Sequence, residues 1–435
     1  MIQSVDFRGA LPSRSQLLTS VPRASIDIGE AVTMVHPLID DVRTRGVEAL
    51  REQAERFDGV RPAQLKMPVQ RIREATEALD PAVRDALIEA IRRVRLATEA
   101  QVPPERTTTL APGATIVQRW VPVSRVGLYV PGGKAVYPSS VVMNVVTAQV
   151  AGVESIALVS PAQTEFGGEV HPSILAAAGL LGVDEVYAVG GAGAIAALAY
   201  GVPELDLEPV DVVTGPGNIF VAAAKRVVNG VVGIDAEAGT TEILVIADDS
   251  ANPDYVAADL ISQAEHDEAA AAVLVTSSAR LATTVVDALE RLVPLAENEA
   301  RVRAALGGPQ SAVILVDDLD AAVQVSNAYG PEHLEIHTSE NERLVGEIRN
   351  AGAIFVGDFS PVSLGDYIAG SNHVLPTGGS ARYSSGLGAY AFLRAQQVVT
   401  YSHAALTEVH EPLVALAQAE HLPAHGAAAT IRMNN

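Results

Sequence analysis

Apolar positions recur at helical spacing along residues 27 to 100, as in the segment DDVRTRGVEALREQAERF. Spacing of three and four residues between apolar positions predicts several amphipathic helices in this region. From about residue 115 to 360, short β-branched runs alternate with helical patterns. The runs are RVGLYV, SIALVS, EVYAVG, DVVTG, EILVIAD, AAVLVTS, SAVILVDD and AIFVGDF. Because strands alternate with helices, the chain is predicted to be an α/β protein with mostly parallel sheet.

The number of predicted strands suits two doubly wound, Rossmann-like units better than one. Gly-rich segments near 130 and 240 interrupt the pattern, and after about 382 the chain is predicted to be helical again. The expected division is an N-terminal segment (1–26), a first α/β domain (27–129 with 240–381), a second α/β domain (130–239) and a C-terminal helical segment (382–435).

An uncharged stretch between Lys134 and Glu154 is long enough to span a bilayer. It contains Pro138, Asn144 and Thr147 and carries two serines near its start, so it predicts a buried helix capped by serine and not a membrane span. The first residues lack the long apolar core of a signal peptide, and the cytoplasm is the expected compartment.

The charge and the residue types of the chain limit the kinds of molecule that it can be expected to bind. The formal net charge of -22 gives no basic field for nucleic acid and disfavours an anionic membrane surface, whereas it favours a cationic small molecule. An anionic cofactor therefore has to be held by local backbone amides or helix N-termini. The chain has no cysteine, which excludes disulfides, thiolate zinc sites and a thiohemiacetal route for aldehyde oxidation.

Three Gly-rich turns each follow a predicted strand and open a predicted helix. They are VPGGKAVYPSS, VGGAGAIAAL and TGPGNIFVAAAKR. Such a turn presents free backbone N–H groups that can hold a phosphate, although tight packing of a strand against a helix requires glycine equally. Gly191, Gly193 and Ala196 match the pattern GxGxxA, which is too short to decide between these two interpretations.

The residues that could bind a metal are scattered along the chain. Gln263 and His266 are three residues apart and would share one face of a helix. His373 follows Asp366, and His425 lies near the C-terminus. Taken singly, each histidine could equally be a hydrogen-bonded or an exposed residue, but together such nitrogen and oxygen ligands without sulfur would suit zinc or a neighbouring divalent metal.

A further candidate is the pair Glu332 and His333, which follows a Gly-Pro turn in YGPEHLEIH. An adjacent acid and imidazole on a loop could point into one cleft as a general base and a proton shuttle. The alternative is a solvated turn, because loops collect polar residues in any case.

Several of these segments, in this order, resemble the histidinol dehydrogenase family. The stretch IDAEAGTTEILVIADDSANPDYVAADLISQAEHD is similar to a signature of the family that exceeds thirty residues. Similar segments are GLYVPGGKAVYPSSVVMN, TGPGNIFVAAAKR, YGPEHLEI, GDYIAGSNHVLPT and AEHLPAH. The resemblance covers nearly the whole chain and implies a zinc-dependent enzyme that oxidises L-histidinol to L-histidine through L-histidinaldehyde, with reduction of two NAD.

The resemblance also implies roles for individual residues, which are grouped here by their function in the family. The zinc ligands, one ion per subunit, fall on Gln263, His266, Asp366 and His425. The catalytic pair falls on Glu332 and His333. The substrate is contacted by the zinc ligands, by His333 and by three further residues, Thr241, His373 and Glu420. The cofactor contacts fall on Tyr129, Gly193 and Asn218. Glu420 and His425 reach across a dimer in the family, so a homodimer with shared active sites is expected. The first α/β domain would carry the zinc and catalytic residues, and the second the cofactor turns.

Three positions depart from the pattern of the family. Gly193 stands where many members have a glutamine that contacts NAD, Thr240-Thr241 replaces Pro-Ser, and Val362 replaces a glutamate, which we expect to remove an acidic contact near the substrate.

Two other functions are compatible with parts of the sequence. A zinc hydrolase would use Glu332 to activate water, and a two-lobed binding protein would share the α/β architecture, but neither would form NADH.

Overall fold

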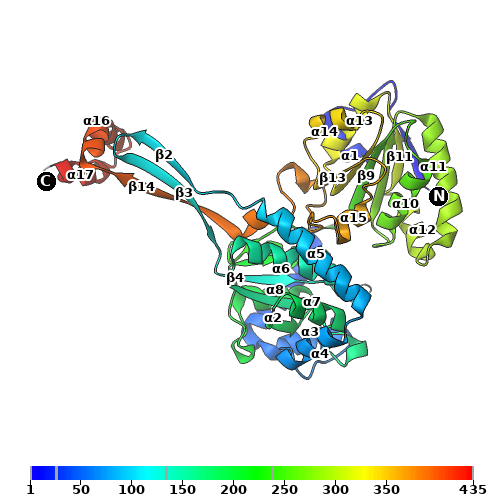
Figure 1. Cartoon of the computed structure of the whole chain (residues 1–435), viewed down its shortest axis with the longest axis horizontal. Helices are drawn as coiled ribbons and strands as arrows, with labels where there is room; N and C mark the ends of the chain where they lie inside the picture. The colour runs from blue at the N-terminus through cyan, green and yellow to red at the C-terminus, as the bar shows by residue number, and fades with distance from the viewer. Residues whose placement is uncertain (1, 25–27, 133–135, 238, 434–435) are drawn as a thin grey trace.

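The computed structural model describes residues 2–24, 28–132, 136–237 and 239–433. Figure 1 shows two globular units and a thin arm that leaves one of them and ends in helices. Each unit is a parallel sheet with helices on both faces, so the predicted α/β class with two doubly wound units is confirmed. The N-terminus lies in the first unit, and the C-terminus lies at the far end of the arm (Figure 1).

The first unit is built on a parallel sheet of six strands within the described residues, in the order β1-β11-β10-β9-β12-β13. The strands are β1 (Gln3–Asp6), β9 (Glu242–Ala247), β10 (Ala271–Thr276), β11 (Ala312–Leu315), β12 (His333–His337) and β13 (Ala353–Val356). The strand order reverses between β9 and β12, which pair in parallel with His333 opposite Ile243. The amino ends of these two strands therefore lie side by side.

Helices cover both faces of this first sheet. One face packs on α10 (Pro253–Ala264), α11 (Ala279–Leu292) and α12 (Glu299–Gly307), and the other on α1 (Arg14–Ser20), α13 (Leu319–Tyr329) and α14 (Asn341–Glu347). Along β9, Ile243 and Val245 contribute to the first core, whereas Leu244 and Ile246 contribute to the second. Burial on both faces explains why ILVIA, which follows Glu242 in β9, is a continuous apolar run and does not alternate.

The second unit contains a parallel sheet whose described strands have the order β6-β5-β4-β7-β8. They are β4 (Arg125–Tyr129), β5 (Ser155–Ser160), β6 (Val186–Ala188), β7 (Val212–Thr214) and β8 (Gly233–Ile234). The order reverses between β4 and β7, and ligands of open α/β sheets bind beyond the carboxyl ends of the strands at such a reversal. The segments after Tyr129 and after Thr214 flank this position.

The expected domain boundaries need correction, because residues 28–99 pack on the second sheet and not on the first. Helices α4 (Val69–Ala78), α5 (Pro81–Glu99), α6 (Pro138–Ala151) and α7 (Pro172–Leu180) cover one face of that sheet, and α2 (Ile28–Arg45), α3 (Val47–Phe57), α8 (Gly191–Tyr200) and α9 (Ile219–Val228) cover the other. Strand β4, within the predicted first domain, also belongs to the second sheet, and β1 of the predicted N-terminal segment belongs to the first. An amphipathic pattern shows that a helix has an apolar face, but it does not show which sheet that face will cover.

The arm is an antiparallel ribbon of β2 (Arg106–Ala111), β3 (Ala114–Pro122) and β14 (Leu393–Tyr401). It carries α16 (His403–Ala419) and α17 (Pro423–Thr430), which confirms helices in the C-terminal segment, but β14 was not predicted. The ribbon stands away from the units (Figure 1), and most residues of β14 are exposed, so its sequence lacks the alternation that marks a half-buried strand.

Helix α6 corresponds to the uncharged stretch, and most of its residues are buried in the second unit. Its N-cap is Tyr137, whose side chain makes no capping hydrogen bond, so the predicted serine cap is wrong. Ser140 lies one turn inside the helix and instead contacts His373. Within the described residues, no helix is long and apolar enough to cross a membrane.

Candidate active site

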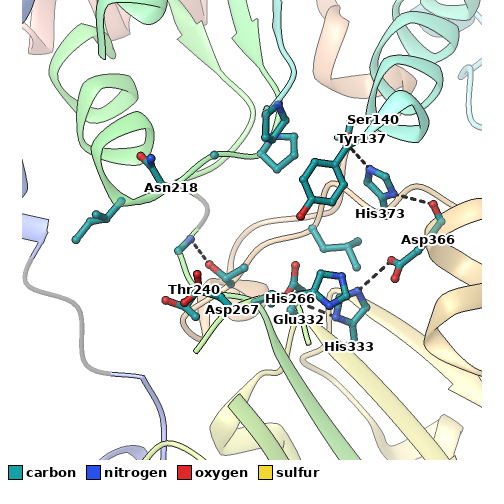
Figure 2. Close-up of a pocket in the computed structure, with 18 of the residues that line it drawn as sticks. Tyr137, Ser140, Asn218, Thr240, His266, Asp267, Glu332, His333, Asp366 and His373 are labelled. Carbon is teal, nitrogen blue, oxygen red and sulfur yellow. Dashed lines mark hydrogen bonds and ion pairs between the residues drawn. The ribbon is translucent and has the colours of Figure 1, made fainter. Parts of the chain in front are cut away.

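A pocket of about 650 Å³ lies where the two units meet (Figure 2). Its walls come from the amino ends of β9 and β12 in the first unit and from the segments after β4 and β7 in the second. Seven of the predicted site residues line it: Asn218, Thr241, His266, Glu332, His333, Asp366 and His373. Its size is sufficient for a small substrate with part of a larger ligand, because ligand pockets commonly enclose about 300–1,000 Å³.

His333 is oriented by the backbone of the neighbouring strand. Its Nδ1 lies 3.2 Å from the carbonyl oxygen of Glu242, which can only accept, so Nδ1 carries the proton. The other ring nitrogen, Nε2, is buried without a hydrogen-bond partner among the described residues and lies 3.9 Å from Oδ1 of Asp366. In this tautomer Nε2 carries a lone pair that can accept a proton.

Glu332 is the second buried group of the pair. Its Oε2 accepts hydrogen bonds from Thr241 Oγ1 at 2.6 Å and from the backbone N–H of Glu242 at 2.8 Å, and lies 3.5 Å from His333 Nδ1. Burial raises the pKa of Glu332 above its usual range, although His333 and these hydrogen bonds oppose the shift. A carboxyl group with a raised pKa is suited to exchange protons near neutral pH.

Gln263 has an unused acceptor next to the pocket. Its side chain is buried at the end of α10, where Nε2 donates to Thr241 Oγ1 at 2.6 Å. Its Oε1 has no hydrogen-bond partner within the described part of the chain. A buried carbonyl oxygen is costly to leave unpaired, so this atom points to a missing ligand.

His266 and Asp366 lie on the same side of the pocket (Figure 2). Nδ1 of His266 lies 3.0 Å from the carbonyl oxygen of Ser262, and this bond leaves Nε2 as an acceptor with a lone pair. The nitrogen of His266, the oxygen of Gln263 and the carboxylate of Asp366 form a mixed donor set that suits zinc. The described residues therefore fit the expected metal in type and in availability.

His373 connects the two units across the pocket (Figure 2). Nδ1 donates to the carbonyl oxygen of Asp366 at 2.8 Å, so Nε2 accepts from Ser140 Oγ at 2.9 Å. Burial lowers the pKa of His373, which keeps the ring neutral. Both ring nitrogens are thus occupied, and His373 fixes the position of Asp366 while its ring lines the substrate space.

The predicted cofactor residues are only partly brought to the pocket. Asn218 lines it at the N-terminus of α9, where its Oδ1 accepts from the backbone N–H groups of Phe220 and Val221. Tyr129 is buried, with its hydroxyl 3.4 Å from the backbone nitrogen of Gly191, and burial raises its pKa to about 12. Tyr129 and Gly193 are not among the described residues that line the pocket, and part of the first Gly-rich turn (133–135) lies outside the described residues.

Gly193 packs directly against α3. A Cβ atom at this position would lie 2.6 Å from Oε1 of Gln53, whose Nε2 is already bonded to the carbonyl oxygen of Leu38. Gln53 thus occupies the space next to the glycine.

We expect Gly193→Gln to destabilise the fold by about 1–3 kcal/mol because the new side chain overpacks this contact. Urea unfolding measures the loss. The double variant Gly193→Gln with Gln53→Ala should recover most of it, and a single variant as stable as the wild type would contradict this account of the contact.

Two predicted residues, Glu420 and His425, lie on the arm and are exposed. Glu420 ends α16, and His425 belongs to α17, far from the pocket of the same chain (Figure 1). The structure of a single chain therefore does not bring these two residues to the site.

Another group of potential metal ligands lies away from the pocket. Asp259, Glu335 and His337 are buried together, and the ligand atoms that they offer lie within 4.8 Å of one another. His337 Nε2 contacts Glu335 Oε2 at 3.4 Å, and the backbone N–H of Val362 donates to Glu335 Oε1 at 2.9 Å. The side chain of Val362 belongs to the apolar core and is not among the described residues that line the pocket.

Asp259 makes the contribution of this group to the stability of the fold depend on pH. Burial raises its pKa to about 7, well above its ordinary value, with Glu335 adding to the shift. The unfolded chain releases this proton near pH 4, so it binds fewer protons than the folded chain until the pH passes about 7. The contribution of Asp259 to stability therefore falls as the pH rises through this interval.

We expect Asp259→Asn to reduce the fall in the free energy of unfolding between about pH 5 and pH 8, because the amide cannot ionise. Urea unfolding at several pH values measures this difference. Asp254→Asn, which changes a half-exposed acid of the same helix, is the control and should keep the pH dependence of the wild type. If Asp259→Asn kept the pH dependence of the wild type, the ionisation of Asp259 could not be the cause of that dependence.

Glu242 is the main residue that the sequence analysis missed. It is buried at the start of β9 and contacts Glu332 and His333, the predicted catalytic pair, through its backbone. A charged residue at the head of an otherwise apolar strand was the available signal. Tyr137 and Thr377 also line the pocket, but nothing in their sequence context marked them.

The family model for histidinol dehydrogenase matches residues 21–433 of the chain. The histidinol dehydrogenase of Leifsonia xyli subsp. xyli is 66% identical, and the alignment covers 99% of each chain. That of Thermobifida fusca is 60% identical over 100% of this chain and 98% of the relative.

A solved structure shares the whole fold. The histidinol dehydrogenase of Elizabethkingia anophelis is 30% identical and superposes with a TM-score of 0.92, covering 100% of this chain and 98% of that one. The similarity therefore includes both units and the arm, not one domain alone.

Proposed function

The chain belongs to the histidinol dehydrogenase family, oxidoreductases of histidine biosynthesis, and we propose that it oxidises L-histidinol to L-histidine through L-histidinaldehyde, reducing two NAD. The observation that carries this proposal is the pair of buried, unpartnered atoms at one pocket, His333 Nε2 and Gln263 Oε1, among the described residues. In the tautomer with the proton on Nδ1, the first atom has a lone pair that can accept a proton, and the second atom has lone pairs that can bind a metal.

Zinc is the metal that we propose for this pocket. Gln263 Oε1, His266 Nε2 and the carboxylate of Asp366 would hold it, and His425 of a second subunit would complete the set of protein ligands. When bound, zinc would act as a template that holds and orients the substrate by its nitrogen atoms. Glu332 and His333 remain free for proton transfer.

In the first oxidation, His333 Nε2 accepts the proton of the alcohol while the carbinol carbon gives hydride to NAD, and the aldehyde results. The hydrogen bond from Nδ1 to the carbonyl oxygen of Glu242 stabilises the ring in the tautomer that this step requires. The carboxyl group of Glu332 has a raised pKa and lies 3.5 Å from Nδ1. As the ring of His333 becomes protonated, the positive charge that it gains can therefore be shared between the two side chains.

In the second oxidation, water adds to the aldehyde, since the chain offers no cysteine for a covalent route. Both hydrogen bonds that described residues donate to Glu332 end on Oε2, so Oε1 is left to accept from water. Glu332 removes a proton from this water while the protonated His333 returns its proton to the aldehyde oxygen, and the hydrate forms. The hydrate then gives a second hydride to a second NAD, and His333 Nε2 accepts the hydroxyl proton, which leaves the carboxylic acid. The four electrons of the overall oxidation thus leave as two hydrides.

The cofactor is proposed to bind at the strand reversal of the second sheet. Pro131 follows β4, and Gly217 and Asn218 follow β7, and all three line the pocket. Asn218 caps the N–H groups of Phe220 and Val221, so the N-terminus of α9 offers the N–H of Ile219 and the positive end of the helix dipole to a phosphate, which the net charge of -22 would otherwise repel.

We propose a cytoplasmic homodimer in which the arm of each subunit completes the site of the other. At the pocket, His266 and Tyr367 are exposed in the single chain, Tyr367 at 60%. The arm carries exposed apolar side chains, among them Val399 at 61% and Leu416 at 65%. Apolar surface of this extent on a protruding arm indicates a partner that covers it.

The test is NADH formation from L-histidinol and NAD, followed by absorbance. L-leucinol is the matched control, because it is also an amino alcohol but has no imidazole for the metal. Formation of NADH from L-histidinol alone supports the proposal. Equal rates with L-leucinol would contradict the proposed substrate, and no NADH with either compound would contradict the proposed reaction.

A further inference from the structure

Glu242 is the one described residue whose backbone is bonded to both catalytic side chains. Its N–H donates to Glu332 Oε2 at 2.8 Å, and its carbonyl oxygen accepts from His333 Nδ1 at 3.2 Å. The position of this single peptide segment at the head of β9 therefore sets the distance and orientation of both groups.

The side chain of Glu242 points away from the pocket into a buried network. Arg23 donates to its two oxygens, from Nε at 2.9 Å and from Nη2 at 3.2 Å, and Tyr329 donates its hydroxyl to Oε2 at 3.1 Å. Arg23 also donates to the carbonyl oxygen of Tyr329 at 2.6 Å and stacks on its ring, with 3.7 Å between the guanidinium carbon and the ring centre. These contacts connect three residues that come from three separate segments of the chain.

We propose that Arg23, Glu242 and Tyr329 act as a positioning unit that holds the head of β9 in register with Glu332 and His333, an inference that rests on the proposed function of that pair. None of the three touches the substrate space, because they are not among the described residues that line the pocket. They act on the reaction through the backbone of Glu242.

Charge and burial explain why the unit needs all three members. The side chain of Glu242 is only 3% exposed, and burial raises its pKa to about 7 although Arg23 opposes the shift. Without Arg23 the carboxylate would be a buried, uncompensated charge that must protonate or move. Either response displaces the backbone groups that orient the catalytic pair.

A second contact connects Arg23 to the pocket. A Cβ atom on Gly379 would lie 2.5 Å from Nη1 of Arg23, so the loop that carries Gly379 is seated directly on this side chain. The same loop contains Thr377, which lines the pocket and accepts a hydrogen bond from the backbone of Gly239. Movement of Arg23 would therefore also move one wall of the pocket.

The test compares Arg23→Gln, Arg23→Lys and the double variant Arg23→Gln with Glu242→Gln in the zinc-loaded protein. For Arg23→Gln we expect kcat to fall about tenfold or more, because small displacements of catalytic groups are costly, with a nearly unchanged dissociation constant for L-histidinol by calorimetry. Arg23→Lys should recover part of kcat. The double variant should recover part as well, since it removes both buried charges together.

A structural measurement accompanies the kinetics. In protein labelled with ¹⁵N-histidine, the His333 signal, assigned with His333→Asn, should show protonation at Nδ1 in the wild type and a mixture of tautomers in Arg23→Gln. This signal does not depend on turnover. A wild-type protein that forms no NADH from L-histidinol would contradict the proposed function, whereas the tautomer would still decide the positioning proposal.

Arg125→Gln is the matched control. It breaks a half-buried ion pair with Glu185 in the second unit, whose side chains are 13% and 26% exposed, so it costs stability without touching the network. It should retain the kcat and the His333 signal of the wild type. The proposal is overturned if Arg23→Gln behaves like this control in both measurements, and Tyr329→Phe provides the same comparison should Arg23→Gln fail to fold.

Discussion

Replacing His333 with asparagine is expected to lower kcat by about 10²–10⁴-fold, the usual contribution of a general base, and to change the binding of L-histidinol much less. The reason lies in Nε2, a buried nitrogen that no described residue occupies and that faces the pocket. The amide group of asparagine can still donate to the carbonyl oxygen of Glu242 but cannot take the proton of the alcohol. Steady-state kinetics and calorimetry with L-histidinol measure the two quantities separately.

His337→Gln is the control for this variant. His337 lies four residues further along β12, is equally buried and points to the same face of the sheet, but it contacts Glu335 and does not line the pocket. A stability loss without a large loss of kcat is expected there. If His333→Asn kept kcat within about tenfold of the wild type, His333 could not be the base of the reaction.

Replacing His425 with asparagine should have a comparably large effect, although this residue lies on the arm far from the pocket of its own chain (Figure 1). We expect loss of bound zinc and of most activity, because one of the four proposed protein ligands is removed and metal-dependent orientation is lost. Metal analysis of the purified variant and its rate of NADH formation are the measurements.

The same variant tests whether the sites are shared. Co-expressed with the inactive Glu332→Gln chain, it should form mixed dimers with one intact site, in which Glu332 of one subunit meets His425 of the other. With random pairing, about a quarter of all sites are then intact, and activity recovers to that fraction. Isolated mixed dimers without activity would contradict a site built from two subunits.

The sequence pattern predicted most strands of the two parallel sheets, since these strands are apolar runs bounded by turns. It missed β1, β8 and β12 and placed His333, the first residue of β12, on a loop. It assigned α2 to α5 to the wrong unit, because periodicity identifies an apolar face but not its partner. It missed β14, whose residues are mostly exposed on the arm.

Only part of the site could be predicted from the sequence, for a similar reason. The pair Glu332 and His333 and the metal residues Gln263, His266 and Asp366 came from distant segments, and only the family resemblance placed them together. The structure adds what spacing could not give: the tautomer of His333, the unpaired oxygen of Gln263 and the backbone contacts of Glu242. These depend on strand pairing between β9 and β12, which is non-local.

We propose that one pocket performs both oxidations with the help of a bound metal. This can be tested by the amount of NADH formed per L-histidinol when the substrate is limiting and NAD is in excess, before chelation, after chelation and after zinc is restored. We expect close to two NADH per L-histidinol, almost none after chelation, and recovery with zinc. One NADH per L-histidinol, with the aldehyde accumulating, or an undiminished yield after complete removal of the metal, would contradict this proposal.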